Sequence, residues 1–520
     1  MFVEPVTEKE IEDIIKDLKI SSAGWDAISA SAVKKSYSSV LSPLSFVMNL
    51  SITCGVFPNE LKLARVIPLF KAGDVTSFSN YRPVSVLPLF SKILERLMYS
   101  RLLLFINENK LLYAFQFGFR KDHSPNLALV YLVDKISNAL EDGEFVLGVF
   151  LDFSKAFDTV NHDILFSKLE FYGVRDVSLN WFKSYFNSRQ QFVEYNGATS
   201  KSQNITCGVP QGSILGPLLF LIYINDLASV SSKIFTLLFA DDSNLFLSGN
   251  NPNTLIQTMN TEIDKVIDWL KINKLSLNLK KTHFMLFRRR RARVLLDTDL
   301  VIDGVKIDMV NKTNFLGVII DPHLTFKSHI LYIKGKVARG VGILNKCKKY
   351  LNASTLVTLY YSFLYPYFNY CNCIWGNTYQ SYLTPLIKLQ KRAVRIISFA
   401  DRNAHTEPLF KKLKILDLSK VFVYCVQLFM FKYHHGLVPS IFQNIYVFNH
   451  DLHEYMTRQS DCMHSFGART TQRYRTLRFV GIKIYNHFIG KINMDRLFMT
   501  YKYHLKKYLV DNDMSCLTTN

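Results

Sequence analysis

Long apolar segments are missing from this sequence. No run of about eighteen apolar residues is present, and the N-terminus carries no apolar core of a signal peptide. The segment Leu218–Ile224 is strongly apolar, but it has the length of a core segment and is too short to span a bilayer. We therefore expect an intracellular protein that has no signal peptide, no transmembrane segment and no membrane partner.

Cysteine is scarce and shows no regular spacing. The sequence has 8 cysteines, and the one close pair, Cys371 and Cys373, has no histidine following at the distance of a zinc knuckle. Neither a disulfide framework nor a structural zinc site is expected. Reduced and mostly buried thiols fit an intracellular protein.

Acidic residues are fewer than basic ones. The chain has 42 Asp and Glu against 63 Lys and Arg, which gives a formal net charge of +21. This balance favours a polyanionic partner, because contacts with phosphates release counterions. Other basic proteins share this charge, so it does not identify the partner. A hydrophobic fraction of 48% over 520 residues indicates a globular protein, with room for about two to four structural units.

Three acids stand at positions that predict chemistry. Asp241 and Asp242 lie between two apolar runs, a pattern that predicts a β-hairpin with both acids at its turn. Adjacent negative charges repel each other, so a bound cation would stabilise this turn. Asp152 follows Phe145–Leu151, an apolar run typical of a buried strand. Three such carboxylates would make a hard-oxygen site suited to Mg²⁺. Two ions about 3.5–4 Å apart are typical of phosphoryl-transfer polymerases.

Each acid also has an ordinary explanation. An isolated Asp-Asp pair is usually a solvated turn, and Asp152 could cap a helix, because Ser154–Phe157 follows it. A third segment, Gly208–Pro217, lies between the two acidic sites and favours the catalytic interpretation.

A series of further motifs accompanies these three segments in a fixed order. They are Ala64–Lys71, Asn80–Ser85, Gln116–Ser124, Leu151–Asp158, Gly208–Pro217, Phe239–Asp242, Trp269–Lys281 and Asn314–Gly317, followed by the less specific Leu389–Ile397 and Ala404–Pro408. In order and spacing, over roughly Val3–Asp321, the chain resembles the reverse transcriptases of non-LTR retrotransposons, that is, LINE-type elements similar to jockey. The fingers blocks of that family correspond to Ala64–Lys71 with Asn80–Ser85, and to Gln116–Ser124. Its palm motifs A, B, C and D correspond, in this order, to Leu151–Asp158, Gly208–Pro217, Phe239–Asp242 and Trp269–Lys281. Its primer grip corresponds to Asn314–Gly317.

The resemblance implies an α+β fold of the right-hand polymerase type. It has fingers, a palm with an antiparallel sheet and an Asp-Asp hairpin, a helical thumb, and here a helical C-terminal extension. We expect an N-terminal helical extension over residues 1–50, fingers and palm over 51–321, the thumb over 322–400 and a basic C-terminal region over 401–520.

Local patterns predict several elements directly. A helix is expected over Val6–Lys19, where Thr7 and Glu10 form a capping-box pattern. Further helices are expected over Ser42–Leu50, which would start with serine as cap and proline in its first turn, and over Ser91–Phe105.

Two basic segments have more than one interpretation. Arg288–Arg293 fits either a solvated connector after a strand or a loop that contacts phosphates. From Ile330 onward the pattern is helical and basic. This suits a thumb that grips a duplex backbone, although an ordinary amphipathic helix has the same pattern.

The resemblance also assigns the metal site. Asp152 and Asp241 would be direct ligands of two Mg²⁺ ions, for which Mn²⁺ can substitute. Asp242 would support or share coordination, and the backbone carbonyl of Phe153 would complete a site. These ions would activate the primer 3′-hydroxyl and neutralise pyrophosphate.

Other residues would bind the incoming nucleotide. By the resemblance, Lys71 and Arg82 would contact the triphosphate, since Arg binds phosphate bidentately and Lys acts as a point charge. Phe157 would lie beneath the sugar and exclude a 2′-hydroxyl, although it could equally be a core aromatic. Gln211 and Gly212 would line the nascent base pair, although they also fit a turn before an apolar helix.

The remaining family positions would contact nucleic acid. These are Arg120, Lys281, Phe315, Leu316 and Gly317, and Lys281 could also protonate the leaving pyrophosphate.

RNA-dependent RNA polymerases are the rival class. They also space two acids as Asp152 and Asp158 are spaced, and use the second to recognise a 2′-hydroxyl. They generally have Gly where this chain has Ala240, and they lack a segment like Pro210–Gly212. The comparison therefore favours DNA synthesis.

The expected function is that of an RNA-directed DNA polymerase that copies element RNA by target-primed reverse transcription. Its partners would be an RNA template, a DNA primer or target DNA, and dNTPs, and it would act in the nucleus. Endonuclease activity is not expected in this chain. The alternative is a truncated or co-opted remnant that binds nucleic acid without catalysis.

Overall fold

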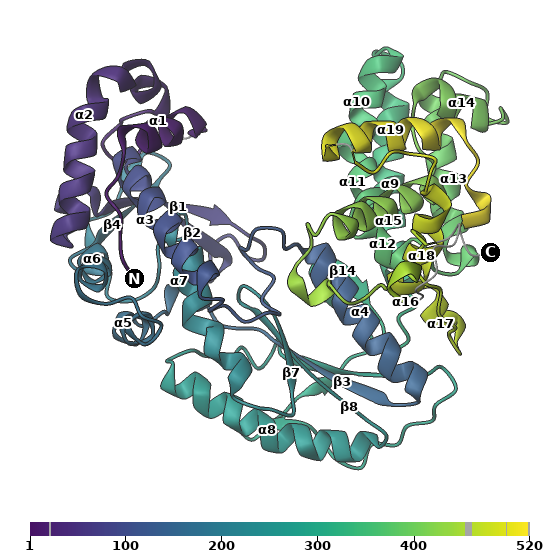
Figure 1. Cartoon of the computed structure of the whole chain (residues 1–520), viewed down its shortest axis with the longest axis horizontal. Coiled ribbons are helices and arrows are strands. Elements are labelled where there is room, and N and C mark those ends of the chain that lie inside the picture. The colour runs from purple at the N-terminus through teal and green to yellow at the C-terminus, as the bar shows by residue number, and fades with distance from the viewer. Residues whose placement is uncertain (20–21, 453–459, 496, 518–520) are drawn as a thin grey trace. The chain divides into compact units, whose positions relative to one another are not determined.

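The structure, a computed structural model, describes residues 1–19, 22–452, 460–495 and 497–517 (Figure 1). The chain forms two compact units, each assembled from separate segments. Unit 1 contains Met1–Phe119, Leu151–Ser243 and Thr261–Thr282, whereas unit 2 contains Arg120–Phe150, Asn244–Asn260 and His283–Asn520. Helices and sheets are mixed along the chain, as the predicted α+β class requires.

The first predicted helix is present as α1, Glu8–Asp17. Thr7 caps it as expected, because its hydroxyl accepts a hydrogen bond from the Glu10 backbone N–H at 3.2 Å. The Glu10 carboxylate does not return to the cap. It pairs instead with Arg101 of α3 (Leu89–Glu108), at 2.8 and 3.0 Å, and so ties α1 to that helix.

The second helix is longer than the sequence suggested. Helix α2 spans Ala30–Cys54 and is capped by Ser29, so the predicted start at Ser42 is wrong. Pro43 lies inside the helix, where a proline removes one backbone hydrogen bond without ending the helix. Buried residues on both sides of Pro43, among them Val33 and Met48, hold the two halves to one apolar face.

A five-stranded sheet in unit 1 carries the fingers motifs. Its strands are β1 (Leu63–Phe70), β2 (Tyr81–Val86), β4 (Gln190–Tyr195), β5 (Ala198–Thr199) and β6 (Gln203–Asn204). Their order is β2-β1-β4-β5, and β6 also pairs with β4. Strands β1 and β2 are antiparallel, with Leu69 opposite Arg82, and Lys71 follows at the turn.

Four helices form the core of unit 1 with this sheet: α3, α5 (His162–Phe171), α6 (Asp176–Phe186) and α7 (Leu215–Ile224) (Figure 1). The expected third helix is therefore confirmed as α3. Helix α7 is buried along almost its whole length, which explains why its sequence has no polar face.

A second five-stranded sheet has the order β12-β9-β3-β8-β7. Its strands are β3 (Phe145–Leu151), β7 (Phe235–Phe239), β8 (Asp242–Gly249), β9 (His283–Phe287) and β12 (Asp308–Met309). Strand β3 pairs antiparallel with β9, and Val146 lies opposite Phe287. Strands β7 and β8 are neighbours joined by two residues, so the predicted Asp-Asp hairpin is confirmed.

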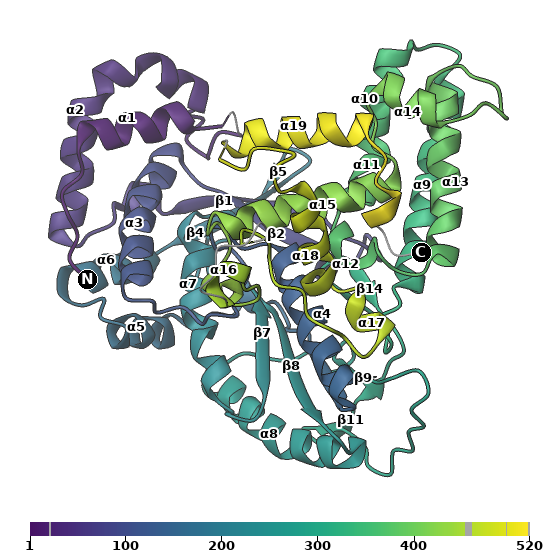
Figure 2. The same cartoon turned by 45° about the vertical axis from the view of Figure 1, so that its right-hand side comes forward.

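Unit 2 is mainly helical after residue 326. Helices α9 (Lys327–Cys347) and α13 (Gln380–Ile397) pack side by side (Figure 2), which confirms the helical pattern expected from Ile330 onward. The other elements outside unit 1's core are α4 (Pro125–Asp142), α8 (Pro252–Ile272), β10 (Val301–Ile302), β11 (Val305–Lys306), β13 (Thr313–Phe315), β14 (Val318–Ile320), α10 (Ala353–Phe363), α11 (Tyr365–Asn369), α12 (Asn372–Trp375), α14 (Glu407–Leu413), α15 (Leu418–His434), α16 (Asn449–Leu452), α17 (Thr471–Tyr474), α18 (Leu477–Phe488) and α19 (Phe498–Asp511). Among the described residues, no helix is long and apolar enough to cross a membrane.

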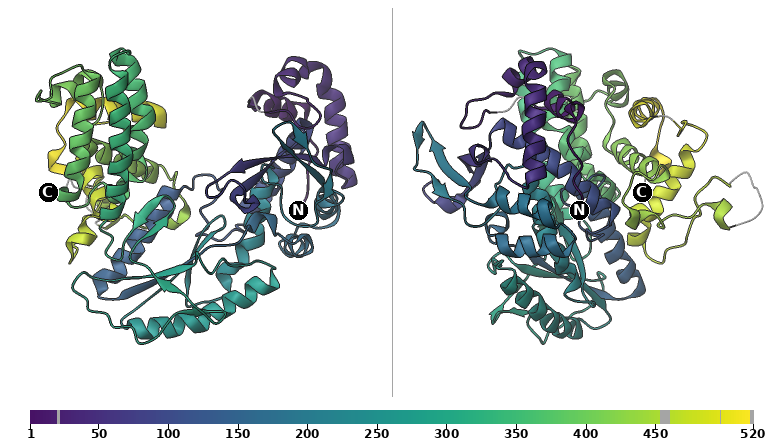
Figure 3. Two further views of the ribbon diagram at one scale, coloured as in Figure 1. Left: turned by 180° about the vertical axis from the view of Figure 1, so that it is seen from behind. Right: turned by 60° about the vertical axis from the view of Figure 1, so that its left-hand side comes forward.

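The C-terminal region is part of unit 2 and contacts α4 directly (Figure 3). The guanidinium of Arg473, on α17, donates to the Asp134 carboxylate at 2.7 Å, to the Asp134 carbonyl at 2.9 Å and to the Asn138 amide oxygen at 3.1 Å. The Arg473 side chain is only 3% exposed. Buried charges need this degree of pairing, so the contact fixes α17 on α4.

The arginine run Arg288–Arg293 follows β9 as a connector. Arg289 donates to the carbonyls of Leu140 and Glu141, at 2.6 Å each, and so satisfies the C-terminal end of α4. The Arg290 guanidinium lies 4.8 Å from the ring centroid of Tyr379. Because these two side chains make contacts within unit 2, the connector interpretation is favoured for this part of the run.

Candidate active site

Asp152 lies where β3 ends, and the segment Ser276–Thr282 holds its backbone in place. The Asn278 N–H donates to the Asp152 carbonyl at 2.7 Å, and Ser154 N–H donates to the Ser276 carbonyl at 2.8 Å. Phe153, between them, is buried and forms a bridge with Leu277. The side chain of Asp152 is 44% exposed, and the Lys281 ammonium lies 3.7 Å from its carboxylate. Motif A is therefore fixed by motif D.

The Asp-Asp turn is held by Gln116, which is buried. Its amide oxygen accepts from the N–H of Gly118 at 2.9 Å and from the N–H of Ala240 at 3.0 Å. Ala240 has a φ of 55°, a left-handed conformation that costs energy for a residue with a side chain. A Cβ atom at Gly118 would lie 2.3 Å from the Ala240 nitrogen, so only glycine fits there. Gln116 lies in a fingers motif, but its role in holding the turn could not be predicted from the sequence.

The three carboxylates affect each other electrostatically. Burial raises the pKa of Asp241, and the charge of Asp152 adds to this rise, whereas Arg82 and Lys71 oppose it. Although Asp242 is partly solvent-exposed, the protein atoms packed around its carboxyl raise its pKa to about 6. The charges of Asp241 and Asp152 contribute to that rise, and Lys71 opposes it. The hairpin therefore concentrates negative charge that a cation would offset.

The chemistry of these donors fits Mg²⁺. Three carboxylates and the Phe153 carbonyl are hard oxygen ligands, the type that Mg²⁺ prefers. Their mutual repulsion is visible in the raised pKa values of Asp241 and Asp242. Over the described residues, however, no group of three or more His, Cys, Asp or Glu side chains is arranged so that it could hold a metal ion as it stands.

The motif B loop is bonded to motif A. Gly208 N–H donates to the Val160 carbonyl and Val209 N–H donates to the Phe157 carbonyl, both at 2.8 Å. A Cβ atom on Gly208, which has a φ of 85°, would lie 2.6 Å from the Asp158 carbonyl. Glycine is therefore required for this close approach.

The same loop is bonded to the fingers strand β2. The side-chain amide of Gln211 donates to the Asp158 carboxylate at 2.8 Å, and the backbone carbonyl of Gln211 accepts from the Ser85 N–H at 2.7 Å. Gly212, with a φ of 125°, passes so close to Ser85 that a Cβ atom would lie 2.5 Å from the Ser85 carbonyl. Gln211 and Gly212 are thus fixed between β2 and motif A.

Phe157 is half-buried and held by aromatic contacts. Its ring stacks on Phe220 of α7 at a centroid distance of 4.3 Å, and the edge of Phe119 lies 6.2 Å away. Burial raises the pKa of Asp158, while the hydrogen bond from Gln211 lowers it. The acid that the rival polymerase class would use on a 2′-hydroxyl is thus engaged by Gln211.

The structure brings most of the predicted site residues together in unit 1. These are Asp152, Phe153, Asp241, Asp242, Lys71, Arg82, Phe157, Gln211, Gly212 and Lys281. Lys71 and Arg82 are exposed on the β1–β2 hairpin and influence the charge of Asp241.

Four predicted nucleic-acid residues belong to unit 2. Burial lowers the pKa of Arg120. Phe315 ends β13, Leu316 and Gly317 form the turn to β14, and the Tyr370 hydroxyl donates to the Leu316 carbonyl at 2.7 Å.

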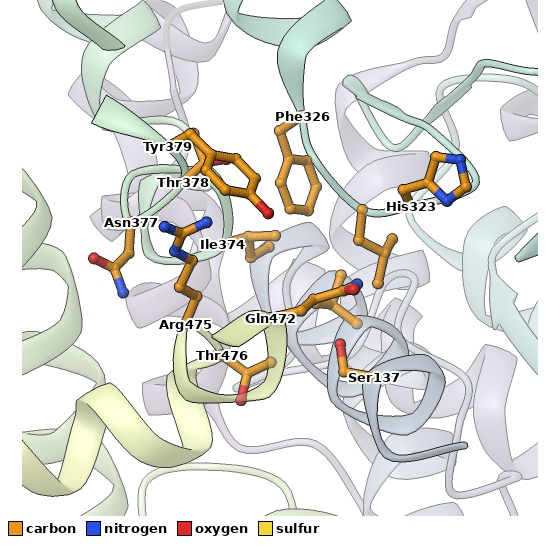
Figure 4. A pocket seen from close by; sticks show the side chains of 12 residues that line it. Ser137, His323, Phe326, Ile374, Asn377, Thr378, Tyr379, Gln472, Arg475 and Thr476 are labelled. Atoms are coloured by element: carbon orange, nitrogen blue, oxygen red, sulfur yellow. The ribbon is translucent and has the colours of Figure 1, made fainter. Parts of the chain in front are cut away.

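Unit 2 also contains a pocket that includes none of these residues (Figure 4). It lies between α4, which contributes Ser137, and the C-terminal segment, which contributes Gln472 and Arg475. The Arg475 guanidinium lies 3.9 Å from the ring centroid of Tyr379. Most of its remaining lining comes from residues 323–326 and 374–379, so the pocket lies where these segments meet α4 and the C-terminal segment.

The unit thus combines a strand-end acid, an Asp-Asp turn, and a glycine-containing loop that is bonded to the segment after that acid, and this combination is typical of a polymerase palm. Residues 71–320 match the family "Reverse transcriptase (RNA-dependent DNA polymerase)".

Curated relatives agree with this assignment. The chain is 30% identical to the "Probable RNA-directed DNA polymerase from transposon BS" of Drosophila melanogaster, over 76% of this chain and 45% of that protein. It is 29% identical to the "RNA-directed DNA polymerase from mobile element jockey" of the same species, over 80% of this chain and 46% of the relative. The chain therefore spans a little less than half the length of these relatives. The resemblance to jockey-like non-LTR elements is confirmed.

Among solved structures, the chain is similar to apo telomerase from Candida tropicalis truncated from its C-terminal domain. The TM-score is 0.36 at 14% identity, over 51% of this chain and 54% of the telomerase chain. A likeness of this size carries no argument about function.

Proposed function

We propose that this chain is an RNA-directed DNA polymerase that copies RNA into cDNA, with an RNA template, a DNA primer and dNTPs as its substrates. The observation that carries the proposal is the convergence of Asp152, Asp241 and Asp242 with the loop of Gln211 and Gly212 in one unit. The relatives are named for this activity. As in jockey-like elements, the DNA primer would be a nicked chromosomal end, and the reaction would take place in the nucleus.

The carboxylates of Asp152, Asp241 and Asp242 and the carbonyl of Phe153 would hold two Mg²⁺ ions, with Mn²⁺ able to replace them. When bound, such ions lower the pKa of the attacking hydroxyl and neutralise charge on the leaving pyrophosphate. Gln116 keeps the two hairpin acids in place by bonding to Ala240. Preorganised ligands of this kind avoid reorganisation during the reaction.

Basic residues of unit 1 would bind the triphosphate. Arg82 suits bidentate phosphate contact, and Lys71 suits a single charge contact. The positive charges of both residues oppose the rise in the pKa of Asp241, so both interact electrostatically with this acid. Lys281, whose ammonium lies 3.7 Å from the Asp152 carboxylate, would give a proton to the leaving pyrophosphate.

Phe157 would exclude ribonucleotides. Replacing Phe157 with Val should remove the ring that blocks a 2′-hydroxyl while leaving the backbone bond from Val209 intact. We expect the preference for dGTP over GTP, as a ratio of kcat/KM values, to fall on the order of 10- to 10²-fold. A Phe220→Leu variant loses the stacking partner but keeps the ring, and should retain most of the preference. An unchanged ratio in Phe157→Val would contradict this role.

We further propose the right-hand arrangement for the finer architecture. Residues 51–321 would supply fingers and palm, 322–400 the thumb, 1–50 an N-terminal extension and 401–520 a basic C-terminal region. The support for a nucleic-acid-binding thumb is its charge. Residues 322–400 contain 11 Lys and Arg and no Asp or Glu. Lys334, Arg339 and Lys346 of α9 and Lys388, Lys391 and Arg392 of α13 are exposed.

Neutralising part of this charge should weaken binding in a salt-dependent way. We expect the triple variant Lys334→Ala/Arg339→Ala/Lys391→Ala to reduce the slope of log K against log salt by about 2 to 3 for an RNA–DNA duplex. Binding would be followed by fluorescence anisotropy between low and moderate salt. A triple variant of exposed lysines on α1 and α2, Lys9→Ala/Lys16→Ala/Lys35→Ala, has the same charge change. If both variants change the slope equally, helices α9 and α13 are not the binding surface.

A second candidate is a nucleic-acid-binding protein without catalysis. The observation that favours it is that, in the described part of the chain, the acids do not stand in a metal-holding arrangement. Primer extension separates the two functions. The purified protein should extend a DNA primer on an RNA template with dNTPs and Mg²⁺ or Mn²⁺. Salt-sensitive binding with no product under either metal would support the second candidate.

A further inference from the structure

Helix α7 is only partly capped by its own sequence, because the Ser213 hydroxyl accepts from the Gly216 N–H at 3.0 Å, whereas the Ile214 N–H lacks a local acceptor. The residue before the helix is Ile214, whose side chain cannot accept a hydrogen bond. The missing acceptor comes from Glu95 on α3, whose carboxylate accepts from the Ile214 N–H at 2.7 Å. The other carboxylate oxygen accepts from the Tyr185 hydroxyl of α6 at 2.9 Å. Glu95 therefore joins α3 and α6 to the start of α7 (Figure 1).

This contact uses a fully buried charge. Glu95 is 0% exposed, and the nearby Arg189 is 1% exposed. Burial raises the pKa of Glu95, while the charge of Arg189 and the hydrogen bonds from Ile214 and Tyr185 oppose the rise. The Arg189 guanidinium lies 4.3 Å from the ring centroid of Tyr185 and donates to the Tyr185 carbonyl at 3.2 Å. The Nη1 and Nη2 atoms of Arg189 are buried without a hydrogen-bond partner, so its charge is offset by the Glu95 carboxyl group and the Tyr185 ring rather than by further hydrogen bonds.

The capped residue is close in sequence to the substrate loop. Ile214 follows Gly212 by two residues and Gln211 by three. On its other side, the loop is bonded to Asp158 through the side-chain amide of Gln211, and to Ser85 through the backbone carbonyl of Gln211. The position of Gln211 is therefore set from two ends: by motif A and β2 at one end, and by the Glu95 contact at the other.

We infer that Glu95 is a positioning residue for the incoming nucleotide, which acts by holding Gln211 and Gly212 through its cap on α7. The inference rests on the proposed function, because it assigns Glu95 to the same nucleotide site. Its favourable interaction with the N-terminal end of α7 adds to the hydrogen bonds, since a negative charge is stabilised there.

Kinetics of a Glu95→Gln variant test this role. The substitution keeps the shape of the side chain but removes its charge and replaces one acceptor with a donor. We expect the KM for dNTP to rise about tenfold, the kcat to stay within about threefold, and the affinity for primer–template to stay unchanged. Tyr185→Phe leaves the Ile214 contact intact and should raise KM less.

Two controls separate this role from a general loss of stability. Arg101→Ala, on the same helix, breaks the pair with Glu10 and should lower the unfolding temperature without raising KM. In the double variant Glu95→Gln/Gln211→Ala, the two effects on KM should be strongly non-additive, because both act through Gln211. Additive effects, or an unchanged KM in Glu95→Gln, would overturn the inference.

Hydrogen exchange tests the inference even if the parent protein makes no product, an outcome that would count against the proposed function only. Backbone amides of residues 208–215 should exchange at least about tenfold faster in Glu95→Gln than in the parent, and as in the parent in Arg101→Ala. Unchanged exchange in the Glu95 variant would show that Glu95 does not hold the loop.

Discussion

Replacement of Asp241 with Asn is expected to lower the rate of nucleotide addition on the order of 10³-fold or more, with little loss of stability. Asparagine has the same shape, so the hairpin and the bond from Ala240 to Gln116 should persist. The carboxylate that would hold the metal is lost, and this removes a major part of the stabilisation of the transition state. Burial raises the pKa of Asp242, and the charges of Asp241 and Asp152 add to the rise, so removing the charge of Asp241 should leave the unfolding temperature unchanged or higher.

Single-turnover primer extension and thermal unfolding measure these two effects separately. Asp163→Asn is a matched control, because Asp163 is an exposed aspartate at the start of α5. It should keep parental activity. Asp242→Asn should retain more activity than Asp241→Asn, since in the proposed metal site Asp242 would only support or share coordination. Activity within threefold of the parent in Asp241→Asn would remove this acid from the catalytic centre.

Replacement of Arg473 with Ala is expected to destabilise unit 2 by about 3–5 kcal/mol, the usual cost of breaking a buried ion pair. Arg473 is 3% exposed and its partner Asp134 is 20% exposed, so the remaining carboxylate and the Asn138 oxygen would lose their donor away from bulk water. The Arg473 side chain also pairs with Glu141, whose carboxylate lies 3.4 Å from the guanidinium.

Urea unfolding of the 520-residue chain measures this change, with Arg478→Ala as the control. Arg478 also pairs with Asp134, but at 3.5 Å and with 34% of its side chain exposed, so its loss should cost about 1 kcal/mol or less. Equal and small effects of the two substitutions would show that the C-terminal segment is not held on α4 by Arg473.

The parts of the site that sequence could predict are those encoded in short segments. The apolar runs beside Asp241 and Asp242 predicted the hairpin, and Thr7 predicted the start of α1. The start of α2 was mispredicted because proline at position 43 was assumed to begin a helix. In the structure, buried residues before and after Pro43 keep one helix continuous.

The parts that could not be predicted depend on partners distant in the chain. Gln116 and Ala240 are 124 residues apart, and Glu95 and Ile214 are 119 residues apart. Neither pair leaves a local pattern, because a buried Gln or Glu looks in sequence like an ordinary surface residue. Arg473, likewise, lies in a region without a recognisable motif, and its role follows only from its contact with α4.

The most direct test of the central claim is extension of a DNA primer on a heteropolymeric RNA template, followed by sequencing of the product. The account predicts a complementary DNA made by the parent protein with Mg²⁺ or Mn²⁺ and with dNTPs, and no product with Asp241→Asn. Absence of product from a folded parent protein that still binds the duplex, or equal product from the variant, would contradict it.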